Sequence, residues 1–150
     1  HGGMPGGYHR SPYLNLSLKG GLTGVITENL SRRNIFKALK NRHCYATTGA
    51  RILLNFTING IMMGSALPHN KFESPNNVSF EVNGTDKIKL VELLKNNQTV
   101  CQWFPDRQDF KSNYVDKENL EKDTYYYLRV TQEDGEMAWS SPIWVEFQAQ

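Results

Sequence analysis

The sequence predicts a mainly β protein: an immunoglobulin-like antiparallel β-sandwich of about seven strands, preceded by a glycine-rich loop and one α-helix. Residues 1–24 contain seven glycines and two prolines, so they cannot form a regular helix or a central strand. Residues 31–42 place apolar side chains at helical spacing. From residue 51 onward, the apolar positions recur every second residue, in short runs separated by turn signals.

The helix is expected from Ser31 to Arg42, with Ser31 or Asn29 capping its N-terminus. Its apolar positions are Ile35, Phe36, Ala38 and Leu39. Arginine and lysine occupy most of the other positions. Lys40 and Arg42 suit the negative end of the helix dipole, whereas the positive run at the helix start suits either solvent or an anionic ligand.

The segment 42–51 is where the sequence changes character. Tyr45 and Thr47 favour extended backbone, and Gly49 permits a sharp change of direction. We therefore expect this segment to join two units. Residues 1–50 hold the loop and the helix, and residues 51–150 form the sandwich.

Alternating apolar positions define the strands of the sandwich. The predicted strands are residues 52–58, 78–82, 88–94, 99–104, 125–132 and 138–147. Asn59-Gly60 is the strongest hairpin signal, and Asp134-Gly135 predicts a second tight turn. The expected loops are the polar stretch through Pro68 and Pro75, and residues 105–122 with Phe110 and Tyr114 as anchors.

A local pattern near the C-terminus resembles the tyrosine corner of fibronectin type III and immunoglobulin-like domains. It consists of Leu120, Thr124, Tyr126, Leu128 and Val130. In that motif the tyrosine hydroxyl hydrogen-bonds to backbone upstream, and the flanking leucine and valine face inward. The Ser140-Ser-Pro142 turn leading into 143–147 likewise resembles a closing edge strand, because proline cannot donate to a strand ladder.

Charge and hydropathy exclude two classes of partner. The chain has 17 Lys and Arg against 15 Asp and Glu, spread without a basic block, so nucleic acid is not an expected partner. No apolar run approaches the length that spans a bilayer, so a membrane is not expected either. The chain begins at His1 rather than Met, so we expect a fragment of something longer. Localisation stays open between cytoplasmic and exported.

No complete catalytic set is present, and we assign no catalytic residue. The histidines are His1, His9, His43 and His69. None stands four residues from another or beside a carboxylate at ligand spacing. Cys44 lacks a placed base. Cys44 and Cys101 are expected as buried, reduced thiols, with a disulfide between them as the alternative.

Six segments carry a resemblance to a known family: residues 1–6, 21–25, 31–39, 42–52, 59–64 and 127–142. The most specific is Tyr-Ala-Thr-Thr-Gly at 45–49. Together they resemble bacterial PHP-type (polymerase and histidinol phosphatase) metal-dependent hydrolases, in a branch that carries a β-sandwich tail. The resemblance covers most of the chain.

The resemblance implies a truncated enzyme. That family has a distorted β/α barrel that holds divalent metal ions, such as Zn, Mn or Fe, on His and Asp ligands. Residues 1–50 would be the closing loop and last helix of the barrel, and His1 would be the histidine of its last Asp-x-His ligand motif. The Asp and every earlier ligand are absent, so this fragment should be inert. A remnant of an expression tag is the alternative for His1.

Three interpretations of function follow. The first is the C-terminal accessory part of a PHP-like phosphoesterase, whose partner is the missing N-terminal barrel of the same chain. It predicts an apolar barrel-facing surface from Leu14, Leu16, Leu18, Ile35 and Leu39. The alternative is a stand-alone binding module for glycan or protein that uses Trp103, Trp139 or Trp144. The third is a structural domain that forms a weak homo-oligomer through a sandwich edge.

Overall fold

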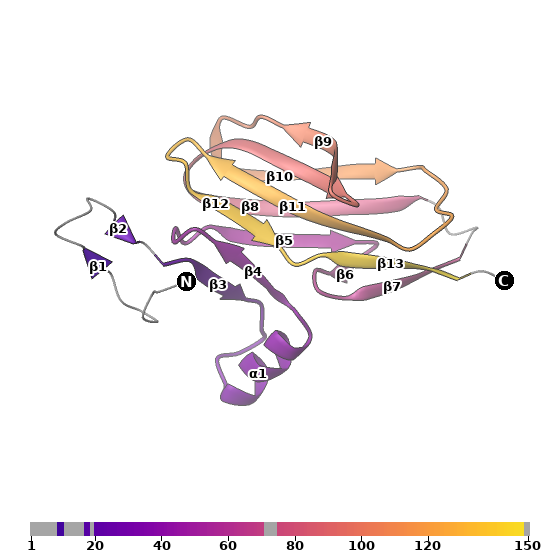
Figure 1. Ribbon diagram of the computed structural model, residues 1–150, viewed down its shortest axis with the longest axis horizontal. Helices are drawn as coiled ribbons and strands as arrows, with labels where there is room; N and C mark the ends of the chain where they lie inside the picture. Colours follow the sequence, from indigo (N-terminus) through magenta and orange to yellow (C-terminus); the bar gives the residue numbers. More distant parts are fainter. Residues whose placement is uncertain (1–8, 11–16, 19, 71–74, 149–150) are drawn as a thin grey trace.

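The computed structural model describes residues 9–10, 17–18, 20–70 and 75–148 and confirms the mainly β class with one helix (Figure 1). The elements in chain order are β1 (His9–Arg10), β2 (Ser17–Leu18), β3 (Leu22–Val25), α1 (Arg32–Lys40), β4 (Cys44–Thr47), β5 (Leu53–Ile58), β6 (Ile61–Met62), β7 (Ala66–Asn70), β8 (Asn76–Lys95), β9 (Gln98–Trp103), β10 (Arg107–Asp116), β11 (Thr124–Gln132), β12 (Met137–Ser140) and β13 (Ile143–Gln148).

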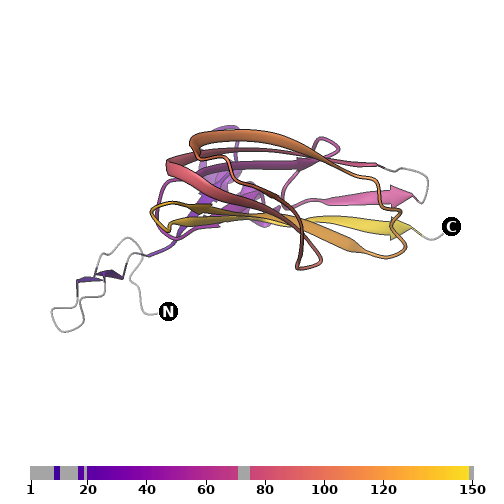
Figure 2. The same cartoon turned by 90° about the horizontal axis from the view of Figure 1, so that it is seen from above.

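The strands after residue 50 form two layers that share one strand (Figure 2). The first part of β8, up to Asn83, pairs with β5 and β10. From Ile88 onward, β8 pairs instead with β11, and further along also with β9. The edge of β11 opposite β8 pairs with two strands: residues 129–131 pair with β12, which leads to β4 and β3, and residues 124–126 pair with β13, which leads to β7. The 20-residue strand β8 is therefore common to both layers.

The transfer of β8 between layers occurs at residues 84–87, where the pairing register with β10 jumps. Gln132, which is 1% exposed, stabilises this bend. Its Oε1 accepts the Thr85 N–H at 2.9 Å and its Nε2 donates to Thr85 Oγ1 at 3.1 Å. A Cβ at Gly84 would lie 2.8 Å from that Oε1 and 2.6 Å from the Asp86 carbonyl oxygen. The bend therefore requires glycine at position 84 for close packing.

Both layers contribute to one hydrophobic core. Its fully buried side chains include Phe56, Ile58, Val82, Leu128 and Val130. These residues occupy the inward positions of β5, β8 and β11, as the period of two predicts. The sandwich arrangement is thus confirmed.

The predicted hairpin at Asn59-Gly60 is confirmed. Both residues have positive φ angles, 50° and 78°, as the tight turn between β5 and β6 requires. Gly135 has a φ of 81° in the turn between β11 and β12, which the sequence also predicts. Two predicted strands, 78–82 and 88–94, are one continuous strand, β8.

The two predicted loops are wrong, because each contains a strand. Residues 105–122 contain β10, which pairs with β8 along nearly its full length. Its outward side chains are exposed and, except for Val115, polar, while Phe110 and Tyr114 lie half-buried against the core. An edge strand needs few apolar residues, which is why composition suggested a loop. The loop through Pro68 contains β7, so the described residues after position 50 form nine strands rather than about seven.

The predicted closing strand is also different from expectation. It divides at Ser141 and Pro142 into β12 and β13. β13 is not an edge, because it pairs antiparallel with β11 and parallel with β7. The parallel pairing joins segments far apart in sequence, and no local pattern signals it.

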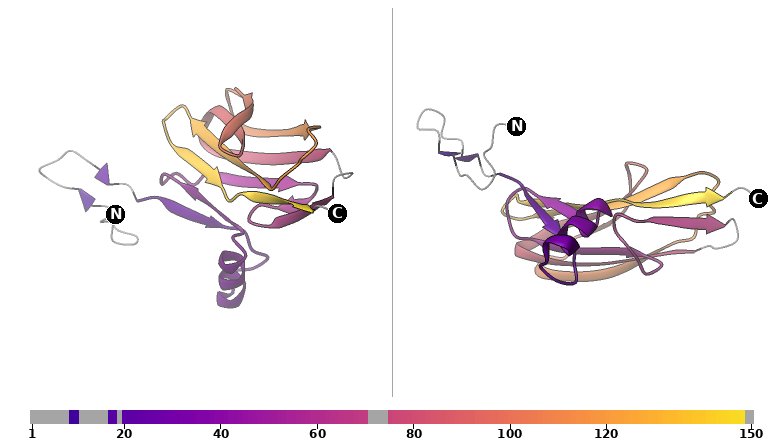
Figure 3. Two further views of the ribbon diagram at one scale, coloured as in Figure 1. Left: turned by 45° about the vertical axis from the view of Figure 1, so that its right-hand side comes forward. Right: turned by 90° about the horizontal axis from the view of Figure 1, so that it is seen from below.

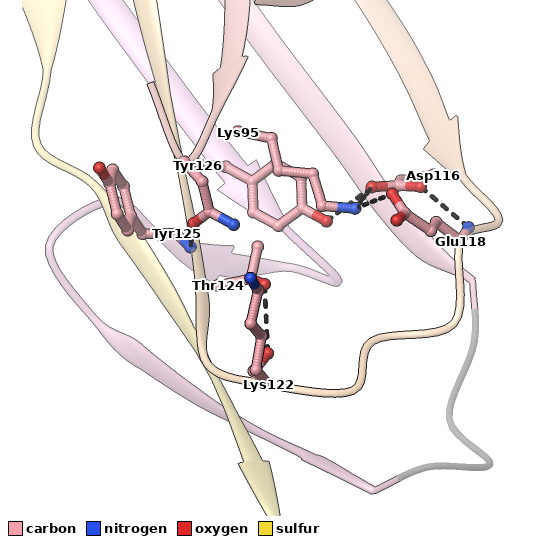
Figure 4. A network of polar contacts seen from close by, with 8 residues as sticks. Lys95, Asp116, Glu118, Lys122, Thr124, Tyr125 and Tyr126 are labelled. Atoms are coloured by element: carbon pink, nitrogen blue, oxygen red, sulfur yellow. Dashed lines mark hydrogen bonds and ion pairs between the residues drawn. The ribbon is translucent and has the colours of Figure 1, made fainter. Parts of the chain in front are cut away.

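The predicted burial around Tyr126 is confirmed, but the predicted backbone acceptor of its hydroxyl is wrong. Leu120, Leu128 and Val130 are buried as predicted. The Tyr126 hydroxyl, however, donates to the Asp116 Oδ2 carboxylate oxygen at 2.6 Å rather than to backbone (Figure 4). Lys95 Nζ donates to the same Asp116 oxygen at 2.8 Å. The buried tyrosine thus belongs to a charged network that joins β8, β10 and β11.

The tight bend in β8 predicts that Gly84→Ala destabilises the protein. The new methyl group would push on the Asp86 carbonyl, which is backbone and cannot rotate away, so the cost should be about 1–3 kcal/mol. Urea denaturation measures this directly. Gly20→Ala is the matched control, since a Cβ there has no atom within 4 Å. Equal stability of the two variants would contradict this account of the bend.

The Asp116 network predicts a specific acid sensitivity. Burial by itself would raise the pKa of Asp116, but hydrogen bonds from Lys95 and Tyr126 outweigh it and hold the pKa below its usual value. A carboxylate with a depressed folded-state pKa contributes stability above its unfolded value of about 3.9 and loses it as pH falls through the folded value. Urea midpoints of wild type and Asp116→Asn at pH 7 and pH 3 should therefore converge on acidification. A stability gap independent of pH would exclude this mechanism.

Candidate interaction site around the helix

Helix α1 is held at its start by the two cap residues that the sequence offers. Ser31 Oγ accepts the Asn34 N–H at 3.2 Å, and Asn29 Oδ1 accepts the Ser31 N–H at 3.1 Å. The helix covers Arg32–Lys40, slightly shorter than predicted. It ends because Arg42 has a φ of 60°, which breaks the helical backbone.

Only part of the predicted apolar face of α1 is buried. Ala38 is 5% exposed, whereas Phe36 is 69% and Leu39 is 45% exposed. Leu30, just before the cap, is 89% exposed. Figure 3 shows why: α1 stands out from the sandwich instead of lying flat on it. Full burial of each large side chain would stabilise the protein by about 1.5–3 kcal/mol, and no described residue provides that burial.

All charged side chains of α1 are positive. Its basic residues are Arg32, Arg33, Lys37 and Lys40, and it contains no Asp or Glu. Within the described residues, none of the four forms an ion pair. Arg32 and Arg33 lie at the positive end of the helix dipole, where cations are disfavoured. The helix therefore presents exposed apolar groups next to unpaired positive charge.

Arg42 and His43, which follow α1, contact the turn between β6 and β7. Arg42 Nε donates to the Gly64 carbonyl at 2.9 Å, and the Arg42 guanidinium lies 5.0 Å from the centre of the Trp144 ring. Gly64 N–H donates to the Pro142 carbonyl at 2.8 Å. His43 Nε2 lies 3.3 Å from Ser65 Oγ. We call this set of contacts the junction.

A cleft of about 450 Å³ lies between α1 and the sheet. Its lining residues are Ile26, Thr27, Glu28, Asn34, Lys37, Ala38, Asn41, His43 and Met62. Asn34, Lys37 and Asn41 recur at helical spacing, so one side of α1 forms a polar wall. The floor is apolar, from Ile26, Ala38 and Met62.

The one metal ligand that the sequence suggested, His1, lies outside the described residues. His43 belongs to the junction and the cleft wall, and His9 and His69 lie in β1 and β7. Among the described residues, no group of three His, Cys, Asp or Glu side chains could hold a metal ion. In the same part of the chain, no helix has the length and hydropathy needed to cross a bilayer.

The three tryptophans do not form one surface. Trp103 lies opposite the buried Val91 and packs edge-on against Phe80, with ring centres 4.8 Å apart, so it belongs to the core side. Trp144 lies opposite Tyr125, and Trp139 lies opposite Arg129. These two point to the outer face, because paired residues of neighbouring strands share a face. The strand register places Trp103 on the core side and Trp139 and Trp144 on the outer face. The sequence pattern did not reveal this difference.

The two cysteines do not form a disulfide with each other. Cys44 and Cys101 are both free and half-buried. Cys44 Sγ lies 3.7 Å from Ser141 Oγ, and burial raises the pKa of the Cys101 thiol. The reduced state is as predicted, although neither side chain is fully buried.

Comparison with known proteins places the chain in a family. A family model described as a protein of unknown function (DUF3604) matches residues 8–84. An uncharacterised protein of Chlamydia pneumoniae is 40% identical over 153 residues, which cover 93% of this chain and 24% of that protein. One from Chlamydia trachomatis is 40% identical over 140 residues, which cover 84% of this chain and 22% of that protein. The chain thus spans about a quarter of the length of the curated relatives it matches.

One solved structure also matches. It is the crystal structure of an engineered protein, 13% identical, which covers 65% of this chain and 20% of that protein with a TM-score of 0.36. That likeness carries no argument about fold or function.

The junction predicts that Gly64→Ala loosens α1 from the sandwich. Gly64 has a φ of 90°, and a Cβ there would clash with the Arg42 carbonyl, so we expect a loss of about 1–3 kcal/mol. Gly60→Ala is the matched control: its φ is 78°, but a Cβ has no atom within 4 Å. Urea denaturation and amide exchange in α1 measure the difference. Equal losses would mean that backbone strain alone, and not close contact, constrains position 64.

Proposed function

This chain belongs to the family described as a protein of unknown function (DUF3604), and that description names no activity. We propose its role from the structure and from the resemblance of its sequence to PHP-type hydrolases. By that resemblance, it is the C-terminal accessory part of a larger PHP-type metal-dependent hydrolase of the phosphoesterase class, and it is catalytically inert by itself. The observation that supports the accessory role is the uncovered apolar surface of Phe36 and Leu39 in α1 and of Leu30 just before it.

The surface has the composition of an interface within one polypeptide. Large apolar side chains project from a helix that the sandwich does not cover, and cationic side chains surround them. Contiguous exposed apolar groups with a polar rim mark interaction sites. The relatives are about four times as long as this chain, so in a protein of their length a partner would lie within the same polypeptide. The remainder of the parent chain is the occupant that we propose for α1.

The described residues do not fit a metal centre, because they lack any group of three ligands. The proposal therefore assigns the divalent metal ions to the remainder of the parent chain. No catalytic step is assigned to the residues described. Their contribution is to bury the helix surface and to hold the sandwich in a fixed position beside the barrel.

The test of docking uses this 150-residue chain and the separately produced remainder of the parent protein. Leu39→Asp should weaken their association at least tenfold, because a tenfold loss needs only about 1.4 kcal/mol and a charge in an apolar interface costs more. Val115→Asp on β10 is the matched control: Val115 is 44% exposed and Leu39 is 45% exposed. Association should be unchanged in the control. Equal affinity of both variants would contradict docking through α1.

The test of activity uses the whole parent protein. It should contain bound divalent metal ions, and it should hydrolyse a phosphomonoester such as p-nitrophenyl phosphate. Chelation should abolish the hydrolysis, and re-addition of metal should restore it. A parent without bound metal and without metal-dependent hydrolysis would overturn the proposed hydrolase, whatever the docking result.

A second candidate is a binding module on the outer face of the sandwich. The specific observation is the cross-strand pair of Trp144 and Tyr125, with Trp139 on the same face. Such aromatic groups could contact glycan or protein. One face of Trp144 is already covered by Arg42, which reduces the area available for stacking. Glycan array binding that is lost in Trp139→Ala and Trp144→Ala would favour this candidate over the accessory role.

A further inference from the structure

The positive charge of this chain is concentrated on α1. The helix holds four of the 17 Lys and Arg residues and none of the 15 Asp and Glu residues, so the rest of the chain carries a net charge of −2. The net charge of +2 for the whole chain therefore depends on a short helix that stands out from the sandwich (Figure 3). Segregation of one sign of charge on an exposed element favours a partner of the opposite sign.

The cations of α1 surround its exposed aromatic residue. Residues three and four apart are neighbours on the surface of a helix. Arg32 and Arg33 therefore lie beside Phe36 on the preceding turn, and Leu39 and Lys40 lie beside it on the following turn. All five side chains belong to exposed residues. The surface thus combines an apolar centre with positive charge at both ends.

The fourth cation of the helix belongs to a different side. Lys37 follows Phe36 directly, which places it about 100° further around the helix. It lines the cleft between α1 and the sheet together with Asn34 and Ala38. The cations next to the exposed apolar groups are therefore Arg32, Arg33 and Lys40. We call these three residues the cationic rim.

Two residues of the cationic rim are placed where they oppose the stability of the helix. Arg32 and Arg33 are the first two residues of α1, directly after the Ser31 cap. The first turn carries the positive end of the helix dipole, which favours Asp or Glu and disfavours Arg. Neither arginine forms an ion pair with any described residue. Carboxylates of a partner would compensate both the dipole and the two guanidinium charges.

We propose that the surface of the parent chain that covers α1 is acidic, with carboxylates opposite the cationic rim and an apolar pocket for Phe36 and Leu39. The inference rests on the proposed accessory role and adds the chemistry of the partner. Guanidinium groups suit such a contact, because they can bind a carboxylate through two parallel hydrogen bonds. A symmetric pair of copies is disfavoured, since two facing α1 helices would repel each other.

Amide hydrogen exchange of residues 35–40, measured by mass spectrometry, tests the acidic contact in the whole parent protein and in the 150-residue chain. In the 150-residue chain, Arg33→Glu should slow exchange about twofold, because a carboxylate in the first turn suits the helix dipole. In the parent, the same substitution should accelerate exchange at least about threefold, because it places a carboxylate against an acidic surface. The opposite signs distinguish a lost contact from general damage to the helix.

A charge reversal away from the helix is the matched control. Lys111→Glu on β10 also reverses an exposed positive charge, and it should leave the exchange of α1 in the parent unchanged. Salt supplies a second measurement on the wild-type parent. Because the Debye length falls from about 10 Å at 0.1 M to about 3 Å at 1 M ionic strength, exchange of residues 35–40 should accelerate over this range.

The outcomes separate this inference from the accessory role. Slower exchange of Arg33→Glu in both the parent and the 150-residue chain would overturn the acidic contact and leave docking through Leu39 intact. Equal exchange of α1 in the wild-type parent and in the 150-residue chain would mean that nothing covers the helix, which would remove the accessory role as well. Protection of α1 only on vesicles that contain phosphatidylserine would assign the surface to an anionic membrane and overturn the proposal.

Discussion

The sandwich depends on β8 crossing from one layer to the other at residues 84–87. Each half of this strand carries a different set of neighbours, so the bend fixes the layers relative to each other. The buried amide of Gln132 replaces the ladder bonds that the bend removes, and Gly84 allows the backbone to approach it. A buried polar group without a partner costs about 1–3 kcal/mol. The Gln132 side chain is therefore required at the bend, because it accepts the Thr85 N–H.

A second crossing, between β6 and β7, places the helix. The turn at Gly64 links the two layers and also receives the Arg42 side chain. Phe36 and Leu39 stay exposed on the helix, whereas Ala38 is buried. The junction therefore holds the residues that follow α1, while Phe36 and Leu39 remain exposed to the partner that we propose.

The proposed docking surface, formed by Leu30, Phe36 and Leu39, belongs to the helix and the residues just before it, which precede the strands of the sandwich core in sequence. The outer aromatic face and the charged network around Tyr126 lie elsewhere in the fold (Figure 4). That network fixes the corner of the sandwich, since its charges are paired with one another. The residues that we propose for docking are therefore different from those of the charged network.

The sequence by itself determined what depends on local physics. Alternation in 52–58 and 125–132, the Asn59-Gly60 turn and the Ser31 cap all act over a few residues, and the structure contains each of them. Tertiary structure decided the rest. The parallel pairing of β7 with β13, the strand at 107–116 and the exposure of Phe36 depend on neighbours distant in sequence. Side-chain period specifies which face is apolar, but only the assembled sheet decides what covers that face.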